Sequence, residues 1–433
     1  MMRRVLIVSP HFPPVNAPDH QRVRQSLPFF AENGWSAEVL AVAPATTEAP
    51  LDPLLADSLP AGIRVHRVSA WNARLCRLLG FGNLAYRAWF PLRRAGDDLL
   101  RTGSFDLVYF STTQFVATAL GSRWRRRFCV PFVVDVQDPW RTDYYERPGA
   151  PPPPGGAKYQ FARWQAARLE PRAWRDASGF ISVNADYLAQ LAARYPWFSA
   201  RPSAVIPFGV SETDFDFARA RTDLAPAFTR EPGAIHLVNV GAVGPIMRAA
   251  LAQLFAGVAL LRQRSPSAAT RLRFHFIGTS YAPAGRAEPS VAPLAEAAGV
   301  SDLVHESTGR IGYFSALATL LAADALVIPG SDDLAYQPSK IAVCFLAAKP
   351  TLAIAPADSA LLTAVRALGF ATTVATASGS ASDEIVDFLQ TRLAPDGPAL
   401  PATRAETAFT ATHTARARTA QQCALFARAL SPI

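Results

Sequence analysis

Short apolar runs alternate with helix-like stretches along this chain, and this alternation limits the folds that it can adopt. The apolar run at residues 5–9 is followed by a polar loop at 10–19. A stretch with helical spacing covers 21–33 and ends at Gly34, and a second apolar run lies at 37–42. A strand, loop, helix and strand in this order begin a parallel, doubly wound sheet. The sequence therefore predicts an α/β fold.

The alternation starts again after a polar, irregular stretch at 211–233, where we place a domain boundary. The expected strands are 63–68, 106–111, 131–136, 179–183 and 204–207 in the first half, and 235–240, 271–277, 304–307, 325–328 and 351–354 in the second. A chain of 433 residues is too long for one ordinary domain. We predict a Rossmann-like domain at 1–210, a second at 211–400, and a C-terminal segment at 401–433 whose helix, at 402–430, packs back on the first domain.

The chain is basic, with a net charge of +9 carried almost wholly by arginine, since Lys158, Lys340 and Lys349 are the only lysines. Such a charge suits nucleic acid, anionic lipid or phosphorylated small molecules as partners, although arginine richness can also reflect genome composition. No nucleic-acid-binding module is visible, so we expect no nucleic acid partner.

The four cysteines are far apart and the seven histidines are scattered, without the spacing of metal ligands. We therefore expect reduced thiols and no metal. No window reaches the apolar length of a membrane span, and the apolar run after Arg3 and Arg4 is too short for a secretory signal. These features predict a cytoplasmic protein.

Residues 71–101 interleave aromatic and aliphatic side chains with arginines. The apolar members are Leu75, Leu78, Leu79, Phe81, Leu84, Trp89, Phe90 and Leu92, and the basic ones are Arg74, Arg77, Arg87, Arg93 and Arg94. One interpretation is a peripheral contact with an anionic membrane surface, which the stretch 123–127 around Trp124 could extend. The other is a helical pair packed on its own domain with solvated arginines. The sequence leaves both open.

An anion site is predicted where the apolar run 325–328 leads through a polar loop to Pro338, Ser339 and Lys340. Proline suits the first turn of a helix, and the unpaired N–H groups of that turn attract anions. The same loop carries Asp332 and Asp333.

A second loop of the same kind follows 235–240, where Gly241 and Gly244 allow close backbone approach and Arg248 lies one helical turn on. Because parallel strands end at one edge of a sheet, this loop and the Lys340 loop should converge on a diphosphate. The stretch 309–312, with Arg310 and Ile311, offers backbone groups to a base.

In the first half, the loop 10–19 holds His11, Asn16 and Asp19. The run 131–136 ends near two carboxylates, Asp135 and Asp138. Such a pair suits hydroxyl binding or acid–base work, and equally suits a loop that caps itself.

A succession of motifs in this chain resembles retaining, nucleotide-sugar-dependent glycosyltransferases of the GT-B class, of the family-4 type that acts in cell-surface polysaccharide assembly. The matching stretches are 6–14, 133–140, 206–210, 239–241, 276–279 and 338–350. The resemblance implies two Rossmann-like, doubly wound parallel-sheet domains facing across a cleft.

The resemblance also implies a role for each half and requires no metal or cofactor, since helix N-termini and basic side chains meet the leaving diphosphate. The second half would bind the nucleotide diphosphate sugar, as co-substrate, through Gly241, Gly244, Arg248, Gly278, Arg310, Ile311, Tyr336, Ser339 and Lys340. The first half would bind a glycan or lipid-linked acceptor beside His11, Asn16, Asp19 and Arg22.

The sequence departs from the family pattern at two positions that usually carry glutamates, which fall here on Ala335 and Val343. The catalytic residue is left unassigned, with Asp135, Asp138, Asp332 and Asp333 as candidates. Two hypotheses follow. The first is a retaining, metal-independent hexosyltransferase, cytoplasmic or peripheral on the inner face of the membrane. The second is a catalytically inactive GT-B protein that binds nucleotide or glycan as a scaffold or regulator.

Overall fold

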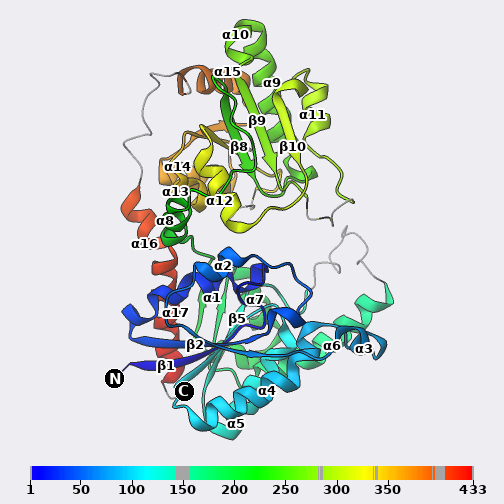
Figure 1. Cartoon of the computed structure of the whole chain (residues 1–433), viewed down its shortest axis with the longest axis vertical. Helices are drawn as coiled ribbons and strands as arrows, with labels where there is room; N and C mark the ends of the chain where they lie inside the picture. Colours follow the sequence, from blue (N-terminus) through cyan, green and yellow to red (C-terminus); the bar gives the residue numbers. More distant parts are fainter. Residues whose placement is uncertain are drawn as a thin grey trace. The chain divides into compact units, whose positions relative to one another are not determined.

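The computed structural model describes residues 2–142, 156–280, 282, 286–334, 336, 340–392, 394 and 405–431. The chain divides into two compact units (Figure 1). Unit 1 comprises Met1–Gly209 and His413–Ile433, and unit 2 comprises Val210–Thr412. Ala335, Pro338 and Ser339, which belong to the predicted donor loop, lie outside the described residues.

The sheet of unit 1 has seven parallel strands in the order β3-β2-β1-β4-β5-β6-β7. Their bounds are β1 Arg3–Val8, β2 Trp35–Val42, β3 Arg64–Val68, β4 Leu107–Ser111, β5 Phe132–Val136, β6 Gly179–Ser182 and β7 Ser203–Val205. In this order the chain moves outward in one direction from β1 and then in the other. The predicted doubly wound parallel sheet is thereby confirmed.

Helices cover both faces of this sheet. They are α1 Gln21–Ser26, α2 Pro53–Asp57, α3 Ala73–Leu78, α4 Leu84–Thr102, α5 Ala119–Phe128, α6 Ala157–Trp174, α7 Ala185–Arg194 and α17 Ala415–Leu430. Helix α17 lies beside α1, and its Phe426 contacts the rings of Phe30, Trp35 and Tyr109 (Figure 1). The C-terminal helix therefore completes the core on one face of the sheet.

The helix predicted at 21–33 is interrupted. Helix α1 ends at Ser26 and passes into the 3-10 turns Leu27–Phe29 and Ala31–Asn33. Pro28 lacks the N–H that would bond one turn back, and its ring crowds that carbonyl, so the regular helix stops.

The sheet of unit 2 has six parallel strands in the order β10-β9-β8-β11-β12-β13. Their bounds are β8 Ile235–Val240, β9 Leu272–Ile277, β10 Val304–Ser307, β11 Ala325–Pro329, β12 Thr351–Ala355 and β13 Thr372–Ala375. Strand β13 was not predicted. It is a short edge strand in which only Val374 is fully buried, so it lacks the apolar run of the central strands.

The helices of unit 2 are α8 Glu212–Ala220, α9 Arg248–Arg264, α10 Pro266–Ala269, α11 Ala292–Ala297, α12 Tyr313–Ala322, α13 Lys340–Ala347, α14 Ala360–Leu368, α15 Ala381–Asp387 and α16 Glu406–His413. Helix α8 lies in the stretch predicted to be irregular. Ser211 caps it by accepting a hydrogen bond from the amide of Asp214 at 3.1 Å. The single helix predicted at 402–430 is two, because Thr414 begins α17 with a cap of its own.

One helix in the described part of the chain, Pro245–Arg264, is long and apolar enough to cross a membrane by length and composition. Its apolar face belongs to the core of unit 2, where Leu254, Phe255 and Val258 are fully buried. This packing accounts for its composition.

Candidate functional site

Three loops meet at the carboxyl end of the sheet of unit 2. Gly241 follows β8 with φ of +111°, and Gly278 follows β9 with φ of +73°. A Cβ on Gly278 would lie 3.8 Å from the carbonyl oxygen of Gly309 and 3.9 Å from the amide nitrogen of Gly241. Glycine alone adopts such backbone angles without strain. The predicted Gly241, Gly278 and 309–312 loops are thus brought together.

Lys340 is the first residue of α13, which follows the loop after β11. Its Nζ would lie 4.0 Å from a Cβ placed on Gly241. This Nζ is buried and has no hydrogen-bond partner among the residues that the structure describes. Burial lowers the pKa of Lys340 to about 8. A buried, unpaired ammonium group is costly. An anion at this position would supply the missing partner.

Lys340 lines a cavity of about 180 Å³ that lies wholly within unit 2. Asn239 and Tyr313 also line it. The Asn239 amide donates to the carbonyl of Val327 at 2.9 Å, and its buried Oδ1 finds no partner in the described structure. The Tyr313 hydroxyl donates to Asp214 at 2.8 Å. The cavity therefore combines a cation and an amide oxygen with apolar walls.

Val343 and Cys344 of α13 form part of the same wall. Burial raises the pKa of the Cys344 thiol to about 12, so it is neutral. Val343, one of the two positions that the resemblance assigns to a glutamate, lines the same cavity as Lys340. The structure thus places the departure noted in the sequence at the cavity itself.

The other predicted donor-side residues are spread around these loops. Gly244 precedes the turn into α9, and Arg248 is exposed at the start of that helix. Arg310 is exposed and Ile311 half-buried before α12. Tyr336 packs against the core of the unit.

Asp332 and Asp333, two of the candidate catalytic residues, are exposed in the loop after β11. The amide of Asp332 donates to the carbonyl of Ile246 at 2.8 Å, and that of Asp333 to the Ser331 hydroxyl at 3.0 Å. The loop after β11 is thereby tied to the loop after β8.

In unit 1, Asp19 is buried at the carboxyl end of the sheet. Its carboxylate lies 3.0 Å from Nδ1 of His11 and accepts from the hydroxyl of Thr112 at 3.0 Å. Burial alone would raise the pKa of Asp19, but the hydrogen bond and charge of His11 hold it below its usual value. Asn16 is half-buried, and its backbone N–H donates to the carbonyl oxygen of Pro50 at 2.7 Å.

Arg22 and Asp135 form a buried ion pair, with Nε and Oδ2 separated by 2.8 Å. Arg22 also donates to the carbonyl of Ile206 at 2.7 Å, and Ser111 donates to Asp135 at 2.8 Å. These contacts give both residues a structural role between β5, α1 and the chain beyond β7. Asp138 is exposed at the same edge, and partial desolvation and the charge of Asp19 raise its pKa.

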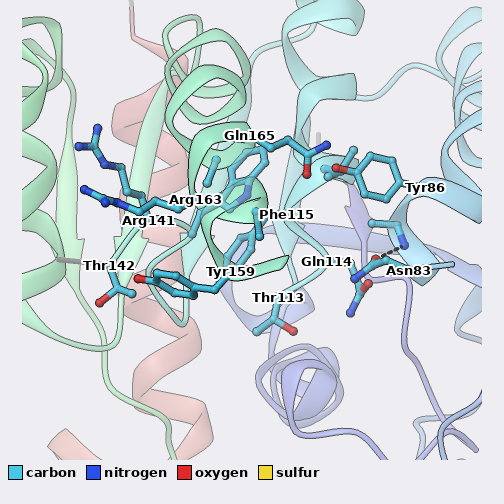
Figure 2. A pocket seen from close by; sticks show the side chains of 15 residues that line it. Asn83, Tyr86, Thr113, Gln114, Phe115, Arg141, Thr142, Tyr159, Arg163 and Gln165 are labelled. Carbon is cyan, nitrogen blue, oxygen red and sulfur yellow. Dashed lines mark hydrogen bonds between the residues drawn. The ribbon is translucent and has the colours of Figure 1, made fainter. Parts of the chain in front are cut away.

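A pocket of about 210 Å³ opens in unit 1 beside the loops that follow β4 and β5 (Figure 2). Its polar lining consists of Asn83, Tyr86, Thr113, Gln114, Arg141, Thr142, Tyr159, Arg163 and Gln165. Arg141 and Thr142 lie on one side of the pocket, and Asn83 and Gln114 on the other (Figure 2). The buried hydroxyl of Tyr86 and the buried Oε1 of Gln114 have no partner within the described structure.

This pocket was not predicted from the sequence. Its residues come from four separated segments. One of them, 83–86, lies within the basic and aromatic stretch 71–101, and another begins at Trp140, the last residue of the matching stretch 133–140. Among the described residues, no three His, Cys, Asp or Glu side chains gather as metal ligands.

The comparisons with known proteins agree with this architecture. Residues 20–209, nearly all of the first part of unit 1, match the model of the glycosyl transferase 4-like domain. No curated protein matches the sequence. Similar solved structures cover both chains almost entirely at low identity, which shows a shared fold.

A Candida albicans trehalose-6-phosphate phosphatase N-terminal domain matches with a TM-score of 0.57 at 12% identity, covering 99% of this chain and 97% of its own. A glycosyltransferase from Rickettsia africae matches with a TM-score of 0.54 at 10% identity, covering 100% of this chain and 99% of its own. An E. coli trehalose-6-phosphate protein bound with UDP-2-fluoro glucose matches with a TM-score of 0.50 at 12% identity, covering 98% of this chain and 97% of its own. Residues 20–209 thus resemble a glycosyl transferase 4-like domain, and the two parallel sheets have the GT-B fold.

Proposed function

We propose that this protein transfers a sugar, with retention, from a nucleotide diphosphate donor bound by unit 2 to a glycan or lipid-linked acceptor bound by unit 1. The observation that carries the proposal is the buried Nζ of Lys340, which has no partner among the described residues and lies beside the Gly241 loop. The donor's diphosphate is the ligand that fits this position.

The diphosphate would be met by three features of unit 2. Lys340 supplies a cation, the glycines let backbone N–H groups approach, and Arg248 supplies a second cation at the start of α9. Together they would stabilise the negative charge that develops on the diphosphate as its bond to the sugar breaks, without a metal. Turnover that persists in excess EDTA supports this assignment, whereas turnover that requires added Mg²⁺ or Mn²⁺ contradicts it.

Asp138 is the carboxylate we assign to the acceptor side. It is exposed, and its raised pKa suits a group that takes a proton from an attacking hydroxyl. Asp135 does not suit this role, because its carboxylate is buried and paired with Arg22.

Calorimetric titration with UDP, GDP and their sugars tests the donor site directly. A protein of similar fold was bound with UDP-2-fluoro glucose, so uridine diphosphate sugars are the first donors to try. We expect micromolar binding that weakens at least tenfold in Lys340→Ala. Equal affinity of Lys340→Ala and the wild type would place the diphosphate elsewhere.

The runner-up function is a scaffold or regulator that binds nucleotide or glycan without turnover. Val343 favours it, since this wall of the cavity offers the sugar no carboxylate. Nucleotide binding without transfer to any acceptor, across an unbiased screen of donors, would support the runner-up.

A further inference from the structure

An apolar groove of about 450 Å³ lies in unit 1, lined by α3, α4, α5 and the segments beside them. Its walls include Trp71, Leu79, Phe81, Phe90 and Leu169. This volume lies within the range of sites for small molecules. These residues belong largely to the basic and aromatic stretch 71–101, whose two interpretations the sequence left open.

The structure leaves much of that stretch in solvent. Leu78 is 84% exposed, Leu79 73% and Leu75 64%, while Trp71, Phe81 and Phe90 are each about half exposed. A helical pair fully packed on its own domain would bury these side chains. Clustered apolar side chains that remain exposed around a groove indicate a binding surface.

The groove is held open by a buried arginine. Arg87 donates to the carbonyl oxygens of Gly82 at 3.1 Å, Trp71 at 2.8 Å and Thr46 at 3.1 Å. Trp71 in turn stacks on Phe90, with ring centroids 5.2 Å apart. The segment around α3 is therefore fixed before any ligand arrives, which lowers the entropy cost of binding.

The groove adjoins the polar pocket of Figure 2. Tyr86, Val116 and Trp140 line both cavities. The two cavities are therefore neighbours that share a wall, one apolar and the other polar. A ligand that spans them needs a hydrocarbon part joined to a polar part.

The polar pocket suits an anionic head. Arg141 and Arg163 line it, and the backbone of Arg141 is fixed by the buried Glu170 at 3.1 Å and by Arg194 at 3.1 Å. The hydroxyl of Tyr86, buried without a partner in the described structure, adds a donor at the junction with the groove. Guanidinium and hydroxyl groups together are typical of phosphate recognition.

We propose that the groove and the pocket together bind a lipid-linked acceptor, with its hydrocarbon chain in the groove and its phosphorylated head in the pocket. This inference rests on the proposed function, in which unit 1 takes the acceptor. In this proposal the groove holds a single lipid chain. In the alternative, the same face of unit 1 lies flat against a bilayer.

Leu78 and Leu79 provide a matched pair for the test. Both are neighbours on the α3 segment and more than 70% exposed, but only Leu79 lines the groove. A bilayer contact would use both leucines, whereas a chain in the groove would use Leu79 alone. Ala119→Trp, which fills the groove from α5, serves as an independent variant.

The experiment titrates the full chain with farnesyl diphosphate, geranyl diphosphate, farnesol and inorganic pyrophosphate, followed by tryptophan fluorescence. We expect farnesyl diphosphate to bind at least tenfold more tightly than pyrophosphate or farnesol, and more tightly than the shorter geranyl diphosphate. Leu79→Ser and Ala119→Trp should each weaken it at least fivefold, with Leu78→Ser unchanged and pyrophosphate binding unchanged in all three.

Farnesyl diphosphate and pyrophosphate binding equally well would overturn the proposal. So would equal losses in Leu78→Ser and Leu79→Ser, together with equally reduced binding to phosphatidylglycerol vesicles, because this outcome identifies a bilayer contact. UDP binding is measured on the same samples. Its failure in the wild-type protein would refute the donor site, while the chain-length dependence would still test the groove.

Discussion

Raising the pH above 8 should weaken nucleotide binding, because Lys340 loses its proton there. The buried Nζ has no partner among the described residues, and its pKa in the free protein is about 8. A bound diphosphate favours the ammonium form, so the pKa rises in the complex. The pKa of Lys340 is thus lower in the free protein than in the complex. The affinity for the nucleotide is therefore highest below the pKa of the free protein and falls as the pH rises above it.

The size of the effect follows from the protonated fraction. With a pKa of about 8, roughly nine-tenths of Lys340 is charged at pH 7 and roughly one-tenth at pH 9. The dissociation constant for UDP should therefore rise about tenfold between pH 7 and pH 9, which corresponds to about 1.4 kcal/mol. At pH 8.5, binding should also take up about three-quarters of a proton.

Isothermal titration calorimetry measures both quantities, when UDP is titrated at each pH in buffers of different ionisation enthalpy. Lys340→Arg is the matched control, because guanidinium stays charged across this range. The difference between the wild-type and Lys340→Arg profiles removes the titration of the nucleotide itself. Parallel profiles for the two proteins would refute the assignment of Lys340 to the diphosphate.

Three further results are expected. Gly278→Ala should lower stability by about 1–2 kcal/mol, because φ is +73°, and should weaken UDP binding; urea denaturation and calorimetry measure the two effects. Asp135→Asn should cost about 3–5 kcal/mol by leaving Arg22 buried without its counter-charge, whereas Asp138→Asn should leave the unfolding midpoint in urea unchanged and reduce turnover. Burial lowers the pKa of His275 from 6.5 to about 4 in the folded protein. Between these pH values only the unfolded chain gains the proton, so the free energy of unfolding should fall by about 3 kcal/mol as the pH drops from 6.5 to 4. His275→Gln should flatten this pH dependence, as measured by urea denaturation.

Most strands of both sheets could be located from the sequence because apolar residues predominate in the central strands. Strand β11 is buried at all five positions, and the run 325–328 marks it clearly. Strand β13 escaped detection because an edge strand needs little apolar surface. Helix α8 escaped because its cap, Ser211, looks like an ordinary loop residue until its bond to Asp214 is seen.

The candidate sites were partly predictable for a related reason. Gly241, Gly278 and Lys340 follow strands, and parallel strands bring the loops at their carboxyl ends to one edge. The burial of Lys340 was not predictable, because it depends on how α13 packs against β11 and α12. Nor was the pairing of Arg22 with Asp135, which are far apart in the sequence.

Val343 leaves Lys340 without a counter-charge one helical turn away on α13. The two residues lie three positions apart on α13, a spacing at which a glutamate and a lysine pair on a helix. A glutamate at 343 could neutralise the lysine before the donor arrives. With valine there, and with no partner among the described residues, Lys340 depends on its ligand for a counter-charge. If the diphosphate binds as proposed, valine at 343 would strengthen its anchoring and would also leave the sugar's surroundings without a carboxylate at this position. The transferase and the scaffold hypotheses both propose a nucleotide site at Lys340. They differ in whether Asp138 of unit 1 takes a proton from an acceptor hydroxyl.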